Sequence, residues 1–236
     1  LIFGGRSGEH EVSLMSARSV RSVLDPQKYD VTEIGISREG LWFTGEKVLE
    51  AFESNHLEGL QPVGLLPEPH DQSLFIRTGD HIDPLPPIDV FFPVTHGTFG
   101  EDGTLQGLFE LADCAYVGCG VLASAVGMDK SLFKEVMRAN NIPVVDSVLL
   151  NRAEISSDIE SCIARIEKAF TFPVFIKPAN LGSSVGITKC RNRSDLYEGL
   201  MEAAQYDRRV LVERGINARE IEVSVLGNDD PVASVA

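Results

Sequence analysis

The chain has 236 residues, of which 43% are apolar and 24% charged, so its composition is that of a globular protein rather than a disordered one. It contains no apolar run of 18 residues, which excludes a transmembrane helix. The formal net charge is −14, and such an acidic chain has too little positive charge to neutralise a phosphate backbone. We therefore expect neither a nucleic acid nor a membrane as partner.

The charge is unevenly distributed. Residues 1–121 hold seven basic and 19 acidic residues, whereas residues 122–236 hold 14 and 16, so an anionic ligand is better accommodated in the second half. The four cysteines form no C-x-x-C pair and no zinc pattern with a nearby histidine. Buried, reduced thiols are the ordinary interpretation, and they predict a cytoplasmic protein.

The first half reads as an α/β domain. The chain opens inside an apolar strand pattern without Met, so we expect the natural protein to have residues before Leu1. A glycine-rich turn, a helix over 12–24 and a strand over 29–36 follow, which is a βαβ unit with a parallel sheet. Residues 45–87 are rich in Gly, Pro and acidic residues, and they predict only one short strand, at 73–77.

The rest of the first half continues this pattern. We expect a buried strand over 88–94, a loop over 95–103, a helix over 104–112 and a strand over 115–117. A domain boundary near Gly120 then divides the chain into domains 1–120 and 121–236.

The second half reads as an α+β domain. The sequence predicts helices over 129–140, 157–169 and 194–206, strands over 144–150, 174–177 and 210–213, and a final antiparallel strand over 221–225 that enters a turn at 228–230.

The strongest local signal for chemistry is the segment Lys177-Pro-Ala-Asn-Leu-Gly-Ser-Ser-Val-Gly186. An apolar strand ends in a lysine, and a Gly/Ser loop then offers successive N–H and hydroxyl donors, which suits phosphate oxygens. It is not a Walker motif, because no Gly-Lys-Ser/Thr opens a helix. A flexible hairpin with an exposed lysine is the alternative, and the buried strand before the lysine favours the phosphate site.

Four further segments are ambiguous alone. The strand 210–214 ends in Glu213, a residue type that can serve a nucleotide but usually faces solvent, and Lys130 opens a helix. Two carboxylates, Glu9 and Glu11, lie where the first helix begins; they could hold an ammonium group, although helix capping is the commoner role of such residues. His96 follows a buried strand at its carboxyl end, where open α/β sheets place ligands.

Together these segments closely resemble the D-alanine–D-alanine ligases of the ATP-grasp superfamily. The matching strings are collinear along the whole chain: Gly4-Gly-x-Ser-x-Glu-x-Glu-Val-Ser-Leu14, His96-Gly-x-x-Gly-Glu-Asp-Gly-x-Leu-Gln-Gly107, Met128-Asp-Lys130, and Lys177-Pro-x-x-x-Gly-Ser-Ser-Val-Gly186 followed by Val212-Glu213. The resemblance implies a Rossmann-like parallel-sheet domain that precedes an incomplete ATP-grasp domain.

The activity that the resemblance implies is a cytoplasmic step of peptidoglycan precursor synthesis. ATP phosphorylates the carboxylate of one D-alanine, and the amine of a second D-alanine attacks the acyl phosphate. The cofactors are ATP and Mg²⁺ or Mn²⁺, with the metal ligands expected downstream of Ala236, so we expect the 236-residue chain to be inactive alone. A homodimer is expected by the same resemblance.

The resemblance also implies roles for individual residues. Glu9 would orient the ammonium of the first D-alanine in a network with Ser183, and Val12 and His96 would also contact this substrate. The residues expected to bind ATP are Lys130, Lys177, Ser184, Glu213, Arg214, Ile216 and Glu220. Arg214 stands where the family often has lysine.

Other functions remain open on these residues. A D-alanine–D-lactate ligase would use the same machinery, and Glu11 in the first string favours alanine. Another ATP-grasp carboxylate–amine ligase is disfavoured by the string from Glu9 to Leu14. A non-catalytic nucleotide-binding module is the expectation if the gene ends at Ala236.

Overall fold

The computed structural model describes residues 1–69, 73–78, 80–182 and 184–236. The first strand β1 (Ile2–Gly4), the helix α1 (His10–Val23) and the strand β2 (Ile34–Ile36) form a βαβ unit in which β1 and β2 are parallel. This prediction is confirmed, although β2 is shorter than the expected strand.

The expected strands around residues 91 and 116 extend the parallel part of this sheet as isolated bridges. Ile2 pairs with Pro93 and Phe91 pairs with Tyr116, both in parallel. The amide of Val94 donates to the carbonyl of Ile2 over 2.8 Å. The sequence therefore placed these strands correctly but overestimated their length.

An antiparallel meander continues the sheet where the sequence predicted a single strand. It comprises β3 (Trp42–Thr44), the helix α2 (Val48–Glu53), β4 (Gln61–Leu65), β5 (Ser73–Thr78) and β6 (His81–Pro87). The sheet order is β1-β2-β3-β4-β5-β6. The expected strand over 73–77 is confirmed as β5, whereas β3, β4 and β6 were missed. The sequence of β6 contains three prolines, which hide it; it lies at the sheet edge, where strands tolerate residues that cannot donate a hydrogen bond.

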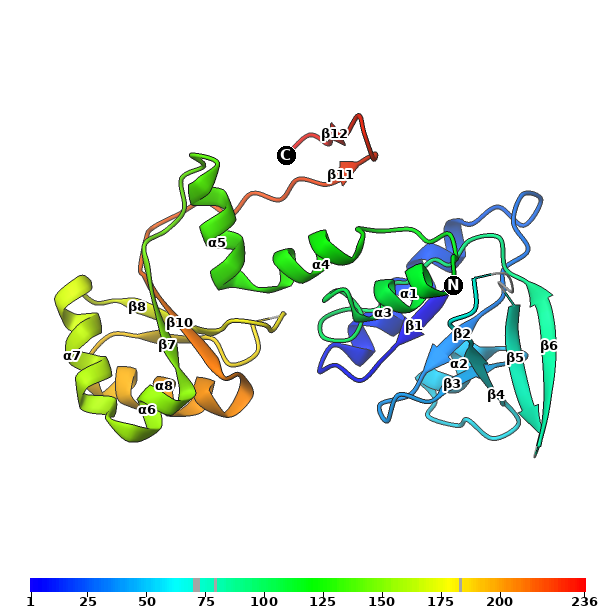
Figure 1. Cartoon of the computed structure of the whole chain (residues 1–236), viewed down its shortest axis with the longest axis horizontal. Coiled ribbons are helices and arrows are strands. Elements are labelled where there is room, and N and C mark those ends of the chain that lie inside the picture. Colours follow the sequence, from blue (N-terminus) through cyan, green and yellow to red (C-terminus); the bar gives the residue numbers. More distant parts are fainter. Residues whose placement is uncertain (70–72, 79, 183) are drawn as a thin grey trace.

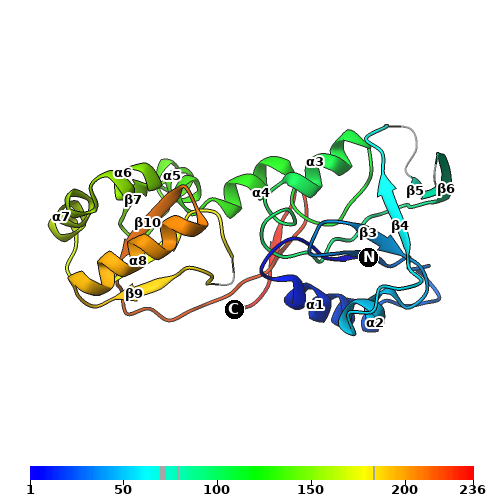
Figure 2. The same ribbon diagram turned by 90° about the horizontal axis from the view of Figure 1, so that it is seen from below.

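Two helices lead from the first sheet to the second part of the chain. The helix α3 (Thr104–Leu111) confirms the prediction, and Leu105 and Phe109 anchor it in the core. The helix α4 (Val121–Met128) was not predicted, because its sequence VLASAVGM has no polar face to mark a 3.6-residue period. In Figures 1 and 2, α4 bridges the two parts of the molecule.

The second part is built on an antiparallel sheet of four strands, in the order β7-β10-β8-β9. Its elements are α5 (Lys130–Ala139), β7 (Ser147–Asn151), α6 (Arg152–Ser157), α7 (Ile159–Ala169), β8 (Val174–Pro178), β9 (Thr188–Cys190), α8 (Arg193–Tyr206) and β10 (Arg209–Arg214). Each expected helix and strand between 129 and 213 has a counterpart, so an α/β part is followed by an α+β part, and this fold class is confirmed.

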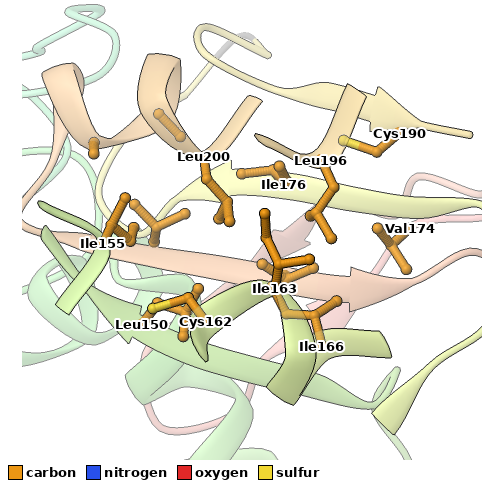
Figure 3. Close-up of a cluster of buried hydrophobic side chains, with 14 residues drawn as sticks. Leu150, Ile155, Cys162, Ile163, Ile166, Val174, Ile176, Cys190, Leu196 and Leu200 are labelled. Atoms are coloured by element: carbon orange, nitrogen blue, oxygen red, sulfur yellow. The ribbon is translucent and has the colours of Figure 1, made fainter. Parts of the chain in front are cut away.

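The two faces of this second sheet differ in character. Figure 3 shows one face packed against α7 and α8 through an apolar core that includes Ile163, Ile176 and Leu200. Successive side chains of a strand point to opposite faces. Lys177 and Glu213 therefore lie on the other face, toward α5, whose Lys134 contacts Glu213. The packing thus leaves one face of the sheet for charged side chains.

The last residues form a small hairpin of β11 (Val225–Leu226) and β12 (Val232–Ala233). The predicted strand over 221–225 is wrong in extent, since pairing begins only at Val225. Ile221 and Val223 are exposed together with the polar residues between them, so their alternation does not correspond to a buried face. None of the helices in the described ranges is long and apolar enough to cross a membrane.

Candidate functional site

A cleft of about 700 Å³ lies between the two parts of the molecule. Its walls come from the loop that follows residue 93, from α1 and α4, and from the Gly/Ser loop after β8. His96, Lys130 and Ser184, three of the residues singled out in the sequence, line this cleft. The fold therefore brings together segments that are far apart in the chain.

The carboxylate of Glu9 lies where the two glycine loops meet. An alanine side chain at Gly182 would come within 2.8 Å of Glu9 Oε2, and one at Gly97 would overlap the same oxygen. Gly97 also has a φ of +72°, a conformation that favours glycine. Glu9 occupies the N-cap position of α1, but it makes no capping hydrogen bond to the described backbone. The carboxylate is thus directed to the loops rather than to its own helix.

His96 is held from both sides. Its Nε2 lies 2.8 Å from Ser16 Oγ on α1, and its Nδ1 lies 3.9 Å from a carboxylate oxygen of Glu101. The hydroxyl of Ser7 donates to the carbonyl of His96 over 2.6 Å. These contacts fix the imidazole beside the loop that carries Gly97, at the cleft wall.

Two residues that follow Glu9 closely in the sequence, Glu11 and Val12, are exposed to solvent. Glu11 is exposed and paired with Arg38, which holds the pKa of its carboxyl below the usual value. Val12 is also exposed, at 45%, and does not line the cleft. Its contact with a substrate stays a prediction.

Lys130 connects the first turn of α5 to the Gly/Ser loop. Its Nζ donates to the carbonyl of Leu181, and its amide donates to the carbonyl of Ala179 over 3.0 Å. Burial lowers the pKa of Lys130, and the positive charge of Lys177 lowers it further, while nearby carboxylates including Glu9 act in the opposite direction. The charge of Lys177 is therefore felt at the ammonium group of Lys130.

Lys177 and Glu213 form an ion pair on the open face of the second sheet. Lys177 Nζ lies 2.7 Å from one oxygen of Glu213, and Lys134 Nζ lies 2.8 Å from the other. Burial of Glu213 tends to raise its pKa, but the two lysines outweigh this effect and hold the pKa below the usual value. Glu213 is therefore buried among charges rather than facing solvent.

The remaining residues expected to bind ATP lie at and after the end of β10. Arg214 is exposed, and its guanidinium lies 3.3 Å from a carboxylate oxygen of Asp146. Ile216 is 52% exposed, and Glu220 is also exposed. None of these three lines the cleft, so their roles stay predictions. Ser183 lies outside the described residues, whereas its neighbour Ser184 has a φ of +61° and faces the cleft.

Three residues that the sequence did not single out fix the base of the Gly/Ser loop. Asp129 caps α5, accepting hydrogen bonds from the amides of Ser131 and Leu132, and it is paired with Arg209. Asp207 accepts from the amides of Asn180 and Arg209. Only the capping role was readable, since Asp before a helix is a common N-cap.

Two buried polar atoms in the cleft wall lack partners among the described residues. They are Thr95 Oγ1 and Gln106 Oε1, and both residues line the cleft. Buried polar groups are usually hydrogen-bonded, so atoms of this kind are typical of a site that receives a polar ligand or ordered water. The cleft wall thus combines Lys130 with unpartnered polar atoms, and the carboxylate of Glu9 lies next to this wall at Gly182.

The described residues contain no group of three or more His, Cys, Asp or Glu side chains arranged to hold a metal ion.

Comparison with known sequences matches the two parts of the chain to two family descriptions. Residues 1–119 match "D-ala D-ala ligase N-terminus", and residues 136–236 match "D-ala D-ala ligase C-terminus". D-alanine–D-alanine ligases of Heliobacterium modesticaldum and Ruminiclostridium cellulolyticum are each 48% identical to this chain. The matches cover 100% and 99% of the chain but only 64% and 65% of those relatives, so the chain spans less than two thirds of their length.

Solved structures of the same family share the fold. The VanG D-Ala:D-Ser ligase from Enterococcus faecalis matches with a TM-score of 0.85 and 37% identity, over 98% of this chain and 66% of that one. The D-alanine–D-alanine ligase from Coxiella burnetii matches with a TM-score of 0.85 and 36% identity, over 99% of this chain and 68% of that one. This chain belongs to the D-alanine–D-alanine ligase family.

Proposed function

We propose that this chain works as part of an ATP-dependent ligase that joins two D-alanine molecules. Full-length ligase here means the protein that contains this chain together with the segment that corresponds to the rest of its relatives. The observation that carries the proposal is the position of Glu9, whose carboxylate meets Gly97 and Gly182 beside a cleft lined by Lys130. The carboxylate of Glu9 suits an ammonium group, whereas Lys130 and the Gly/Ser loop suit phosphate oxygens.

The proposed reaction has two steps. A carboxylate oxygen of the first D-alanine attacks the γ-phosphorus of ATP, so ADP leaves and an acyl phosphate forms. The amine of the second D-alanine then attacks the acyl carbon, and the tetrahedral intermediate loses phosphate and a proton. The catalysis is mainly positioning and charge neutralisation.

Each residue has a defined part in this scheme. Glu9 accepts hydrogen bonds from the ammonium of the first D-alanine, while His96 lies near its carboxylate. Lys130 and Lys177 neutralise phosphate oxygens, and the Gly/Ser loop donates its amides to the same oxygens. Ser184, Arg214, Ile216 and Glu220 complete the proposed ATP site, with Ser183 in the network of Glu9.

The wider assignments follow from the family and are proposals for this chain. Residues 1–120 hold the first D-alanine, and residues 121–236 hold ATP. The protein is a cytoplasmic homodimer, and its product enters peptidoglycan precursor synthesis. Light scattering on the full-length ligase tests the dimer, since a monomeric mass contradicts it.

The identity of the second substrate distinguishes the proposed function from that of related ligases. One similar structure is titled a D-Ala:D-Ser ligase, whereas the relatives at 48% identity are D-alanine–D-alanine ligases. The relatives at 48% identity support D-alanine as the second substrate, with D-serine and D-lactate as the alternatives. Product analysis with each acceptor offered at equal concentration distinguishes the three.

The test of the proposal is D-alanine-dependent phosphate release by the full-length ligase. We expect ATP and D-alanine to give ADP, phosphate and D-alanyl-D-alanine in equal amounts, and we expect Glu9→Gln to abolish turnover while ATP still binds. The 236-residue chain assayed alone should release no phosphate. A full-length ligase that binds ATP but forms no dipeptide would instead support the nucleotide-binding module.

A further inference from the structure

A second lysine of α5, Lys134, is buried beside the proposed ATP site. It lies one helical turn after Lys130, so both side chains leave the same face of α5. Its ammonium group donates to the carbonyl of Val145 over 2.9 Å and to Glu213 over 2.8 Å. Its side chain is only 11% exposed, so this charge is held inside the protein rather than in water.

Glu213 is shared between two lysines of unequal exposure. Lys134 contacts one carboxylate oxygen, and Lys177 contacts the other over 2.7 Å. The Lys177 side chain is 26% exposed, whereas the side chains of Lys134 and Glu213 are both 11% exposed. Lys177 is therefore the member of this group that can turn toward a ligand, and Lys134 is the member that stays.

The difference in exposure between Lys177 and Lys134 matters for nucleotide binding. A lysine that moves from a buried carboxylate to a phosphate leaves that carboxylate without its partner, and an unpaired buried charge is strongly destabilising. With Lys134 in place, Glu213 keeps one close positive charge when Lys177 is drawn away. Before Lys177 moves, the group of two lysines and one glutamate carries one excess positive charge, which also favours a phosphate.

We propose that Lys134 is a positioning residue for ATP: it remains the counter-ion of Glu213 and thereby frees Lys177 for the phosphates. This inference rests on the proposed function, because it assumes that Lys177 contacts ATP. The direction of the Glu213 pKa supports it, since the two lysines keep the carboxylate ionised despite its burial. Lys134 acts through Glu213 and needs no contact with the nucleotide.

The test compares Lys134→Met in two backgrounds of the full-length ligase. With Glu213 present, we expect Lys134→Met to raise the KM for ATP about tenfold while kcat changes less than about twofold, because Glu213 then has only Lys177 left of its two lysine partners and retains it. In a Glu213→Gln background Lys177 has no carboxylate to leave, so adding Lys134→Met should change the KM for ATP less than about twofold.

The control is Lys168→Met, the same chemical change at an exposed lysine near the end of α7, and it should leave the KM for ATP unchanged. An equal effect of Lys134→Met in both backgrounds, or no effect with Glu213 present, overturns the inference. Should Lys134→Met fail to fold, Lys134→Gln removes the charge but keeps a donor for the Val145 carbonyl and carries the same two expectations. Absence of ATP binding by the unmodified ligase would refute the proposed function instead.

Discussion

The role of Glu9 shows how a single residue can be ambiguous in sequence and defined in space. An acidic residue at the start of a helix ordinarily complements the helix dipole. Here its carboxylate is packed against Gly97 and Gly182, two residues from distant loops. Both loops need glycine at these points because a side chain would occupy the place of the carboxylate oxygen.

This packing makes Gly182→Ala a direct test of the position of Glu9. The new methyl group would lie within 2.8 Å of Glu9 Oε2, and φ at Gly182 is not in the left-handed region, so displacement of the carboxylate is the expected effect. We expect the affinity of the full-length ligase for the first D-alanine to fall about 10- to 100-fold, with ATP affinity retained. Calorimetric titration with each ligand measures the two effects.

Gly8, which directly precedes Glu9 in the chain, offers a matched control. An alanine at Gly8 would meet no atom within 4 Å, so Gly8→Ala should leave the D-alanine affinity unchanged. Equal D-alanine affinities for Gly182→Ala and the unmodified protein would show that Glu9 does not hold the ammonium group.

Lys177 provides the corresponding test for the nucleotide. Its removal takes away a charge-assisted contact with phosphate, so we expect Lys177→Ala to weaken ATP binding about 10- to 100-fold. The fold should survive, because Glu213 keeps its contact with Lys134. Binding of ATP is measured on the full-length ligase alongside its melting temperature. Unchanged nucleotide affinity would remove Lys177 from the phosphate site.

At the scale of elements, the helix α5 and the Gly/Ser loop are joined by Asp129. Its carboxylate, itself 8% exposed, caps the first turn of α5 and receives the guanidinium of Arg209, which is 25% exposed. The same strand end holds Asp207, whose carboxylate accepts the amide of Asn180. The position of Lys130 therefore depends on a cap and an ion pair as well as on its own hydrogen bonds to the Gly/Ser loop.

We expect Asp129→Ala to lower the free energy of unfolding by about 3–5 kcal/mol, because it removes a helix cap and leaves the Arg209 charge without its partner. A suitable comparison is Asn192→Ala, which removes only the exposed cap of α8 and should cost about 1 kcal/mol. Urea denaturation of both variants measures the difference. Equal losses for the two variants would mean that the Asp129–Arg209 pair contributes nothing beyond the cap.

The sequence predicted those elements whose signals are local. Apolar periodicity located α1, α3, α5, α7 and α8, and the strand before the Gly/Ser loop was evident from Val174 to Lys177. It found β5 but failed for α4, which has no polar face, and for β3, β4 and β6, where prolines and glycines mask the alternation. The roles of Lys134 and of the Asp129–Arg209 pair were missed because they depend on partners far along the chain, which no local pattern contains.

At the scale of the whole molecule, the cleft between the two parts exposes one cysteine selectively. The expectation of buried thiols is confirmed for Cys114, Cys162 and Cys190 but wrong for Cys119, which is exposed and lines the cleft. Burial raises the pKa of all three buried thiols, that of Cys190 to about 11, so each stays a protonated, poorly nucleophilic thiol at pH 8.

A thiol-directed reagent at pH 8 should therefore modify Cys119 first. We expect ATP and D-alanine together to slow this modification several-fold in the full-length ligase, because ligands in the cleft cover its wall. Peptide mass spectrometry identifies the modified residue, and Cys119→Ser is the control that should abolish the fast phase. A labelling rate that is the same with and without ligands would place the ligands elsewhere.

The division of the cleft between two walls has a consequence for inhibitor design. His96, in the cleft wall, and Glu9, beside the wall at Gly182, come from the first part of the chain, whereas Lys130 and the Gly/Ser loop come from the second. A compound with only an amine or only a phosphonate can engage one wall. A bisubstrate compound that links the two groups over the width of the cleft engages both, and its second contact forms at high effective concentration, so its affinity should exceed that of either fragment by orders of magnitude.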